Sequence, residues 1–428
     1  MRTQKENFVD CKFRGLRELD YMRVFQSTIH TQSIMHRTKD YLSDIIKLIS
    51  LPLLLREVQY TLKFQDDAQI LFFKSQWSAG KRFDKIVKNI TGCCRSYDLM
   101  YYEQEEDKKE SLSFNFSRWI KCLFLYYPSW FFALNHVPFW DRFYYMRHLV
   151  YLLLFEKQLQ CVCIVKYNLL VLFLDTVLIE SYVRECFRQQ GITTSTLQHG
   201  QFRAARGKET CLTDWSIELE DSGVDYFLAW NQLTVDEAHK TQNTATNFIP
   251  LGIPSFIGQE PEKWKNPNNK IFGVVLGHPI NNDENVEMIQ IANKIAKSTG
   301  YSYVLKYHPH FKGDEYDSII DNSAYLSNVK KGIGMKDYAN QVEFSVIGNT
   351  SVMIEMAFMG HPIVHYVKDP KKDIYNDVNG LIKVESSFVP SIDFLNQIAK
   401  FPKDILFDEL CTITNVEESY KKFFSNYQ

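Results

Sequence analysis

The sequence lacks the signatures of several large enzyme classes. It contains no Gly-x-Gly-x-x-Gly fingerprint and no Gly-x-x-x-x-Gly-Lys-[Ser/Thr] loop, which disfavours a dinucleotide-dependent dehydrogenase and a P-loop NTPase. No Asp-x-Asp pair follows an expected strand, so the metal-holding carboxylate pair of one large class of sugar-nucleotide transferases is missing. We therefore expect no cofactor and no resident metal, and any phosphate charge must be met by protein groups.

Long apolar runs and a strong charge of either sign are also missing. The longest approach to a membrane-spanning segment, Asn168 to Leu174, is short and typical of a strand. The net charge is −2, from 49 basic and 51 acidic residues, so no overall field favours nucleic acid. We expect a cytoplasmic protein without a nucleic-acid partner, and its association with the inner face of a membrane stays open.

The nine cysteines show neither a disulfide framework nor a zinc pattern. Cys93 and Cys94 are adjacent, and one residue separates Cys161 from Cys163, which is too close for ordinary disulfides. An odd, scattered set of this kind is typical of reduced thiols in a cytoplasm. The first ten residues are charged and polar, unlike a secretory signal.

What is present is an alternation of strand-like and helical segments along 428 residues, 45% of them hydrophobic. This length is enough for two α/β domains, and strands alternating with helices predict parallel sheets covered on both faces. We predict an α/β fold with two Rossmann-like parallel-sheet domains that face a cleft. The expected strands are residues 68–73, 96–102, 168–175, 193–197, 225–230, 247–254, 271–276, 301–307, 342–347 and 362–367.

The boundary between the domains is predicted at residues 258–270, which are rich in Pro, Asn, Lys and Glu, as linkers are. Residues 1–257 then form the first domain and residues 271–390 the second. Residues 391–428 form a helical tail that is expected to pack back on the first domain.

A helical, aromatic-rich insertion is expected at residues 114–158 of the N-terminal half. Aromatic side chains such as Trp119, Trp130 and Trp140 are interleaved there with arginines and a lysine. One interpretation is a membrane-interface patch, because Trp and Tyr with basic residues suit lipid headgroups. The other is a set of core helices with amphipathic edges, which is favoured because no segment has a clean apolar face.

The most informative stretch runs from Gly348 to Pro362. A largely apolar strand precedes it, small polar residues open a helix, and Gly-His-Pro closes that helix. A helix start with Asn349, Thr350 and Ser351 offers backbone N–H groups beside side-chain donors, which suits a phosphate. Glu355 lies one turn further on, where its carboxylate could take two ribose hydroxyls. The alternative is an ordinary capped helix.

Histidine 199 follows a short strand in the sequence Gln198-His199-Gly200. Because histidine changes charge near neutral pH, His199 is a candidate general base at an open cleft edge. A hydrogen-bonded structural histidine is the alternative. Asp175, at the end of another strand, is a second candidate base, and its alternative role is to cap the following helix.

A third polar cluster is Lys306-Tyr-His308-Pro-His310, at the end of a strand. A lysine and imidazole donors there could stabilise a phosphate leaving group, or form a plain solvated loop. His278, after another strand, is a neighbour of this phosphate loop or a turn residue. A metal site would need His278 and Asp314 as further ligands, and their spacing matches no zinc pattern.

The order of these motifs resembles the GT-B transferases of bacterial surface polysaccharides, over roughly residues 165–367. These are the capsule transferases for Kdo and sialic acid and the glycerol-phosphate or ribitol-phosphate polymerases of teichoic acid. The motifs that carry the resemblance are Gln198-His199-Gly200, Gly252-Ile253-Pro254, Lys306-x-His308-Pro309, Asn349-Thr350-Ser351 with Glu355, and Gly360-x-Pro362.

The resemblance implies metal-independent transfer from a nucleotide-activated donor, which the second domain would bind, while the first would take the acceptor. Lys306, His308, Thr350 and Ser351 would hold the donor phosphates, with Asn349 and His310 beside them, and Glu355 the ribose. His199 would face a glycan or lipid-linked glycan acceptor from the other wall, where Gln198, Gly200, Gly252 and His278 complete the cleft.

The main hypothesis is therefore a glycosyltransferase that uses a CMP-, CDP- or UDP-linked sugar to build capsule or another surface glycan. Teichoic acid polymerases carry Asp-Tyr-Ser-Ser where this chain has Gly348-Asn349-Thr350-Ser351, and they lack the helix glutamate. This difference favours a sugar transferase over a CDP-glycerol type polyol-phosphate transferase. A UDP-sugar 2-epimerase, which needs several carboxylates at the sugar, and a non-catalytic glycan-assembly subunit are further alternatives.

Overall fold

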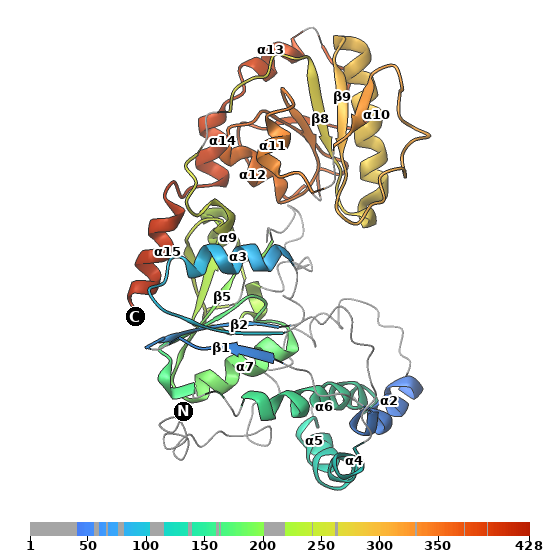
Figure 1. Ribbon diagram of the computed structural model, residues 1–428. Coiled ribbons are helices and arrows are strands. Elements are labelled where there is room, and N and C mark those ends of the chain that lie inside the picture. Colours follow the sequence, from blue (N-terminus) through green and yellow to red (C-terminus); the bar gives the residue numbers. More distant parts are fainter. Residues whose placement is uncertain are drawn as a thin grey trace.

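The computed structural model of the chain describes residues 41–54, 60–65, 67–75, 81–102, 115–135, 139–159, 162, 164–200, 219–241, 243–261, 264–329, 332–371, 373–391 and 393–428. The part of the predicted first domain that precedes residue 41 lies outside the described residues. Figure 1 shows two α/β domains, one above the other, with the red C-terminal helix running along the side of the first domain.

The first domain is built on a sheet with the strand order β1-β3-β2-β4-β5-β6-β7. Neighbouring strands are parallel except at the edge, where β1 runs antiparallel to β3. The strands are β1 (Tyr60–Lys63), β2 (Ile70–Lys74), β3 (Asp98–Tyr102), β4 (Leu169–Leu172), β5 (Thr193–Leu197), β6 (Tyr226–Ala229) and β7 (Asn247–Pro250).

The second domain is built on a parallel sheet with the order β10-β9-β8-β11-β12-β13. Numbered within the domain, this is the 3-2-1-4-5-6 order of a doubly wound nucleotide-binding sheet. The predicted fold class is thereby confirmed. The strands are β8 (Ile271–Val275), β9 (Ser302–Lys306), β10 (Tyr325–Asn328), β11 (Ser345–Ile347), β12 (Ile363–Tyr366) and β13 (Ile382–Val384).

Helices cover both faces of each sheet, because successive strand residues point to opposite sides. In the first domain α3 and α15 pack on one face and α6 and α7 on the other, and in the second α11 and α12 lie opposite α10 and α13. The helices are α2 (Tyr41–Leu54), α3 (Lys81–Thr91), α4 (Phe116–Lys121), α5 (Tyr127–Ala133), α6 (Asp141–Leu159), α7 (Leu178–Gln189), α9 (Gln232–Ala238), α10 (Asn282–Thr299), α11 (Met335–Ala339), α12 (Val352–Phe358), α13 (Phe394–Ala399), α14 (Lys403–Leu410) and α15 (Val416–Ser425).

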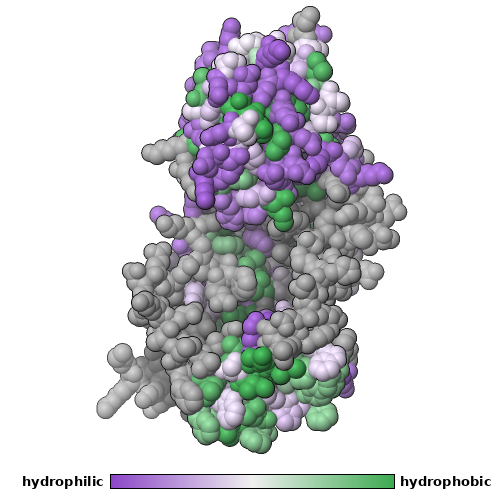
Figure 2. Space-filling view, turned by 90° about the vertical axis from the view of Figure 1, so that its right-hand side faces the viewer, coloured by the Kyte–Doolittle hydropathy of each residue, from purple (hydrophilic) through white to green (hydrophobic). Residues whose placement is uncertain are grey.

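The expected insertion is present between β3 and β4. It consists of α4, a π-helical turn (Cys122–Tyr126), α5 and α6. Trp130 is fully buried, whereas Phe124 and Phe132 are 76% and 73% exposed. Figure 2 shows hydrophobic residues gathered at this end of the molecule, while the second domain presents a mainly hydrophilic face. The insertion therefore contains both packed core residues and an exposed apolar surface.

None of the helices in the described ranges is long and apolar enough to cross a bilayer.

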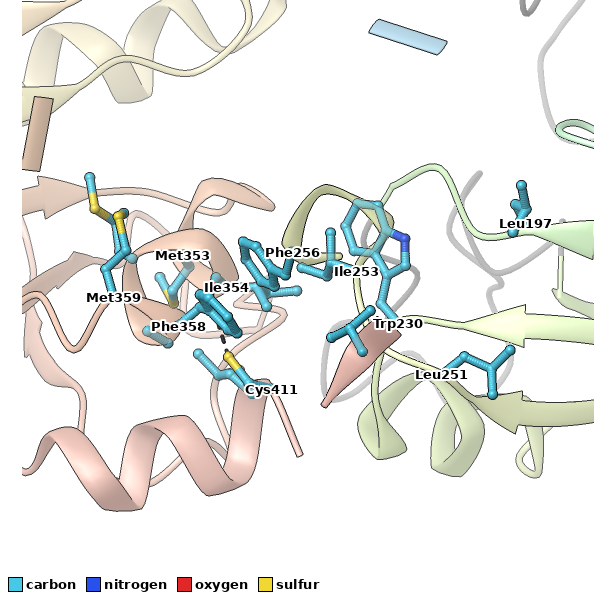
Figure 3. Packing of buried hydrophobic residues seen from close by; sticks show 14 of the residues in the cluster. Leu197, Trp230, Leu251, Ile253, Phe256, Met353, Ile354, Phe358, Met359 and Cys411 are labelled. Carbon is cyan, nitrogen blue, oxygen red and sulfur yellow. Dashed lines mark hydrogen bonds between the residues drawn. The ribbon is translucent and has the colours of Figure 1, made fainter. Parts of the chain in front are cut away.

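One apolar cluster runs from the first domain into the second. Phe256, in the segment after β7, stacks on Phe358 of α12 with ring centroids 3.7 Å apart. Trp230 and Ile253 of the first domain, and Ile354 of the second, belong to the same cluster. Figure 3 shows these side chains meeting between the two sheets. The buried contact joins α12 directly to the segment that leaves the first sheet.

The C-terminal helix α15 packs on the sheet of the first domain. The ring of Phe424 contacts Phe72 of β2, and the Tyr420 hydroxyl donates to the Gly252 carbonyl over 3.2 Å. Gly252 has a φ of +92°, and a Cβ there would lie 2.6 Å from a Val416 methyl. Glycine is required at this position both for the backbone conformation and for the close approach of α15.

Candidate functional site

The polar loops of the second domain begin side by side at the carboxyl edge of its sheet. Val275 of β8 pairs in register with Lys306 of β9 and with Ile347 of β11. Lys306 and Ile347 are thus two strands apart, about 10 Å at the usual strand spacing. The strand order changes direction between β8 and β11, and the crevice at such a switch point is where doubly wound sheets bind ligands.

Three histidines meet above β8 and β9. One ring nitrogen from each of His278, His308 and His310 lies within 4.8 Å of the other two. His278 Nε2 and His310 Nδ1 are 2.9 Å apart, so one donates a hydrogen to the other. The sequence named His278 as a neighbour of this loop or as a turn residue, and the structure places its ring against those of His308 and His310.

Backbone hydrogen bonds orient the His308 ring. The backbone N–H of His310 donates to His308 Nδ1 over 3.3 Å, so in the neutral ring the proton lies on Nε2. Burial lowers the pKa of His308, and the two neighbouring imidazoles lower it further. His308 is therefore a neutral hydrogen-bond donor through Nε2 near neutral pH.

Lys306 lies at the end of β9 and is half-buried. Its ammonium donates to the Ile333 carbonyl over 3.0 Å and lies 5.8 Å from the ring centre of Tyr338. Burial lowers the pKa of Lys306, and the carboxylate of Glu355 partly offsets this. Lys306 therefore lies close enough to Glu355 for the carboxylate charge to act on it.

The predicted strand–loop–helix stretch is present as β11, residues 348–351 and α12. Ser351 is the N-cap residue, but its side chain makes no capping hydrogen bond. A hydrogen bond holds the backbone of Thr350, because the Tyr375 hydroxyl donates to its carbonyl over 2.8 Å. The hydroxyl of Ser351 is thus placed at the start of α12 without being used to cap it.

A carboxylate that the motif analysis missed lies against this loop. Glu284, in the first turn of α10, accepts the backbone N–H of Asn349 at 3.2 Å. A Cβ at position 348 would collide with the same carboxylate, which explains the glycine there. Burial raises the pKa of Glu284. Glu284 lies in the first turn of α10, among the residues Asn282–Asn285. Nothing in the sequence of this segment indicated that the Glu284 side chain would reach Asn349.

A buried network supports the same loop from below. His365 of β12 contacts the Ile347 carbonyl through Nδ1 at 3.2 Å and Asp373 through Nε2 at 2.8 Å. Although burial opposes the charged form, the hydrogen bond and charge of His365 hold the pKa of Asp373 below its usual value. Lys383 completes the network with a 3.3 Å contact to Asp373. These residues hold the loop rather than face a ligand.

In the first domain, Gln198 fixes the loop that carries His199. The Gln198 side chain accepts the Trp230 backbone N–H at 2.6 Å and donates to the Gly200 carbonyl and the Thr234 hydroxyl. His199 is half-buried, with its ring 6.4 Å from that of Phe83 in α3. Gln198 therefore acts as a positioning residue for the loop, and His199 is less buried than Gln198.

Asp175 has a different environment from that expected of an open base. It is 3% exposed, and its Oδ2 accepts from Arg184, from the Ser222 hydroxyl and from the Gly223 N–H at 3.0–3.2 Å. Burial raises the pKa of Asp175, and these donors counteract the rise. Asp175 is therefore a buried carboxylate held by hydrogen bonds, whereas His199 is only half-buried.

The described residues thus form two groups. Around the second sheet lie His278, His308, His310, Lys306, Asn349, Thr350, Ser351 and Glu355, joined by Glu284. Gln198, His199 and Gly200 form the group of the first domain. Asp175 contacts α7, and Gly252 contacts α15. Two parallel-sheet domains, a linker and a C-terminal helix that returns to the first domain define a protein of GT-B architecture.

No family model and no curated protein match the sequence. Among solved structures, the UDP-GlcNAc 2-epimerase of Methanocaldococcus jannaschii, in complex with UDP-GlcNAc and UDP, is 11% identical with a TM-score of 0.48, over 83% of this chain and 99% of that one.

Two further solved structures are also similar. The UDP-forming α,α-trehalose-phosphate synthase of Burkholderia xenovorans is 9% identical with a TM-score of 0.45, over 84% of this chain and 98% of its own. The wall teichoic acid polymerase TagF is 11% identical with a TM-score of 0.43, over 94% and 97%. At these values the three structures assign neither a substrate nor a reaction to this chain.

Proposed function

We propose that the protein is a glycosyltransferase that moves a sugar from a nucleotide-activated donor to a surface-polysaccharide acceptor without using a metal ion. The single observation that carries the proposal is the position of His308. Its Nε2–H donor lies at the carboxyl edge of a 3-2-1-4-5-6 sheet, next to the strand pair where the order reverses. This is the crevice in which a nucleotide phosphate binds in such sheets.

The donor phosphates would be held by groups from neighbouring loops. His308 donates through Nε2, Ser351 and Thr350 contribute hydroxyls, and Lys306 adds positive charge at the edge of the same sheet. These donors act where negative charge builds up as the nucleotide leaves, which is how preorganised donors accelerate group transfer. Glu355, beside Lys306, would take the ribose hydroxyls.

The transfer step has a simple balance of bonds and protons. An acceptor hydroxyl oxygen forms a bond to the anomeric carbon of the donor while the bond from that carbon to the phosphate oxygen breaks. The nucleotide leaves with the electron pair of that bond. The acceptor proton goes to the imidazole of His199, whose loop Gln198 holds in place, and an imidazole suits this role near neutral pH.

Peripheral contact with an anionic membrane belongs to the same proposal. The insertion exposes Phe116, Phe124, Phe132 and Trp140, each by more than half, and Lys121 lies exposed on the same helical segment. Aromatic side chains with basic residues suit the headgroup region. Replacing Phe124 and Phe132 together by Ser should reduce sedimentation with phosphatidylglycerol vesicles, and replacing the exposed Ile280 and Val389 of the second domain should not. Equal sedimentation of both variants would contradict the membrane contact.

A UDP-sugar 2-epimerase is the second candidate, and Glu284 is the observation that favours it. The sequence suggested few carboxylates at the strand ends, but the structure places Glu284 at the Asn349 backbone. A carboxyl group with a raised pKa can exchange protons with a substrate. Incubation with UDP-GlcNAc and no acceptor, followed by NMR, should give no epimer if the transferase proposal is correct.

A thermal-shift panel with CMP, CDP and UDP tests the proposal itself. A ligand at one hundred times its Kd stabilises the folded state by about 2.7 kcal/mol, so one base should raise the Tm clearly above the others. That base would also separate CMP-sugar, CDP-polyol and UDP-sugar chemistry. If no nucleotide raises the Tm of the protein, the result would contradict the proposal and favour a non-catalytic glycan-assembly subunit.

A further inference from the structure

We propose that His278, His308 and His310 form a binding site for a divalent transition-metal ion of the Zn²⁺ type. One nitrogen from each ring lies within 4.8 Å of the others. With Zn–N bonds of 2.0–2.1 Å, tetrahedral geometry places the ligand nitrogens about 3.3 Å apart. The His278 and His310 nitrogens are already 2.9 Å apart, so only a small rotation of rings closes the site around an ion.

His278 and His308 both lie next to regular secondary structure of the second domain. His278 begins the short 3-10 helix Pro279–Asn281, and His308 comes two residues after β9, before Pro309. Because Val275 and Lys306 pair in register, the two loops leave the sheet next to each other. His310 is exposed and His308 half-buried, so the third ring can adjust from the solvent side.

The donor set decides the class of ion. Three imidazole nitrogens without a carboxylate suit Zn²⁺, Ni²⁺ or Cu²⁺, whereas Mg²⁺ and Ca²⁺ require oxygen ligands. Three protein ligands leave a fourth position for water, as in zinc sites that keep an open position. Each imidazole contributes a neutral nitrogen, so the ion keeps its full positive charge.

Metal binding requires a change of tautomer. Nδ1 of His278 accepts the Ile280 N–H at 3.2 Å, and Nδ1 of His308 accepts the His310 N–H at 3.3 Å. Nε2 is therefore the coordinating atom of both rings, and coordination moves the ring proton to Nδ1. Coordination also replaces the 2.9 Å hydrogen bond between His278 Nε2 and His310 Nδ1. The two backbone hydrogen bonds that the proton shift breaks are long and lie in two turns with exposed residues, where water can replace them.

One consequence rests on the proposed function. His308 Nε2 cannot both donate a hydrogen to the donor phosphate and coordinate a metal ion. An ion at the cluster therefore removes a phosphate donor and adds a steric obstacle at the same place. Zn²⁺ should inhibit nucleotide binding by a protein that needs no metal for its own reaction.

A Co²⁺ titration of tag-free, chelator-stripped full-length protein tests the metal site, because tetrahedral Co²⁺ gives intense visible absorption. We expect saturation at one equivalent for the wild type and a loss of more than about tenfold in affinity for His278→Gln and for His310→Gln. His239→Gln, which changes an exposed histidine of the first domain, should bind Co²⁺ as the wild type does. Equal affinities for all four proteins would overturn the site.

The shared use of His308 is tested separately. The Tm increase caused by the nucleotide that binds is measured on metal-free protein and on protein loaded with one equivalent of Zn²⁺. The increase should be smaller on the loaded wild type but unchanged by Zn²⁺ in His278→Gln, which controls for chelation of Zn²⁺ by the nucleotide. An unchanged increase in the loaded wild type would overturn the competition, while a normal Co²⁺ titration without any nucleotide effect would count against the proposed function alone.

Discussion

The rings of Phe256 and Phe358 stack with their centroids 3.7 Å apart and their planes 12° from parallel. Phe256 belongs to the segment that leaves the first sheet, and Phe358 ends α12, the helix that Ser351 begins. The stack therefore connects the domain junction to the loop that is proposed to hold the donor phosphates. A shift of Phe358 at the junction would therefore move α12, whose seven residues separate the stack from Ser351.

A double-mutant cycle with Phe256→Leu and Phe358→Leu should show coupling. Stacked aromatic pairs contribute about 0.5–1.5 kcal/mol beyond the area they bury, so the two changes together should cost less than their sum, measured by urea denaturation. Phe227 and Phe248, whose rings lie 5.2 Å apart within the first domain, provide a control pair. Phe227→Leu should lower stability without weakening nucleotide binding, and strictly additive effects at the junction would contradict the role of the stack.

Gly252→Ala should destabilise the protein more than Gly191→Ala. Both glycines have a positive φ, but a Cβ at position 252 meets Val416 at 2.6 Å, whereas one at position 191 meets nothing within 4 Å. Gly191→Ala thus controls for backbone strain, and the difference reports the contact with α15. We expect a difference of about 1–3 kcal/mol in unfolding free energy, partly relieved in the Gly252→Ala, Val416→Ala double variant. Equal losses for the two single variants would show that α15 does not pack tightly there.

Much of the fold could be predicted because buried parallel strands are continuous apolar runs. The segments that became β4, β8 and β12 are buried along nearly their whole length. The edge strands β1, β10 and β13 could not be found in this way. The residues of β10, for example, are mostly exposed, so no apolar run marks them, and they form only because β9 offers a free edge.

The candidate site was predictable only as far as each loop could be assigned to a strand end. His308 and Ser351 follow β9 and β11, so their position at one edge of the sheet follows from parallel topology. Glu284 could not be found, because its approach to Asn349 depends on how α10 packs against β11. The buried environment of Asp175 was also not predictable from its place after a strand. Its hydrogen-bond donors Ser222 and Gly223 come from a segment that is distant in the sequence.

The stability of the second domain should fall as the pH decreases below about 6.5. His361 is fully buried with one nitrogen near the Ser345 hydroxyl at 2.9 Å, and burial, followed by the charge of Lys403, lowers its pKa from 6.5 to about 3. Between these values the unfolded chain binds a proton that the folded chain does not. Unfolding free energy therefore rises with pH across this window, by up to about 1.4 kcal/mol per unit.

His361→Gln should flatten this pH dependence, because glutamine keeps a hydrogen-bonding group but does not titrate in this range. The measurement is the urea midpoint of wild type and variant at several pH values between about 4.5 and about 7. His239→Gln, at an exposed position, should keep the wild-type slope. Parallel slopes for wild type and His361→Gln would show that His361 is not the group that takes up the proton.

Glu284→Gln should strengthen nucleotide binding if the site holds donor phosphates. The amide oxygen of glutamine can still accept the Asn349 N–H, so the loop is retained while negative charge near the phosphates is removed. Electrostatic contributions of this kind amount to about 1 kcal/mol, or several-fold in Kd. Asp283→Gln, which changes an exposed neighbour, is the control. Weaker binding by Glu284→Gln would instead indicate that the carboxylate contacts the ligand, as the epimerase alternative requires.

The most direct measurement is calorimetric binding of the nucleotide that stabilises the protein best, compared between the wild type, His308→Ala and His239→Ala, all stripped of metal. His308 is proposed to donate through Nε2 to a donor phosphate, and a hydrogen bond to a charged group contributes about 1.5–3 kcal/mol. The account predicts a Kd at least about tenfold weaker for His308→Ala and an unchanged Kd for His239→Ala. The same Kd for all three proteins would contradict it.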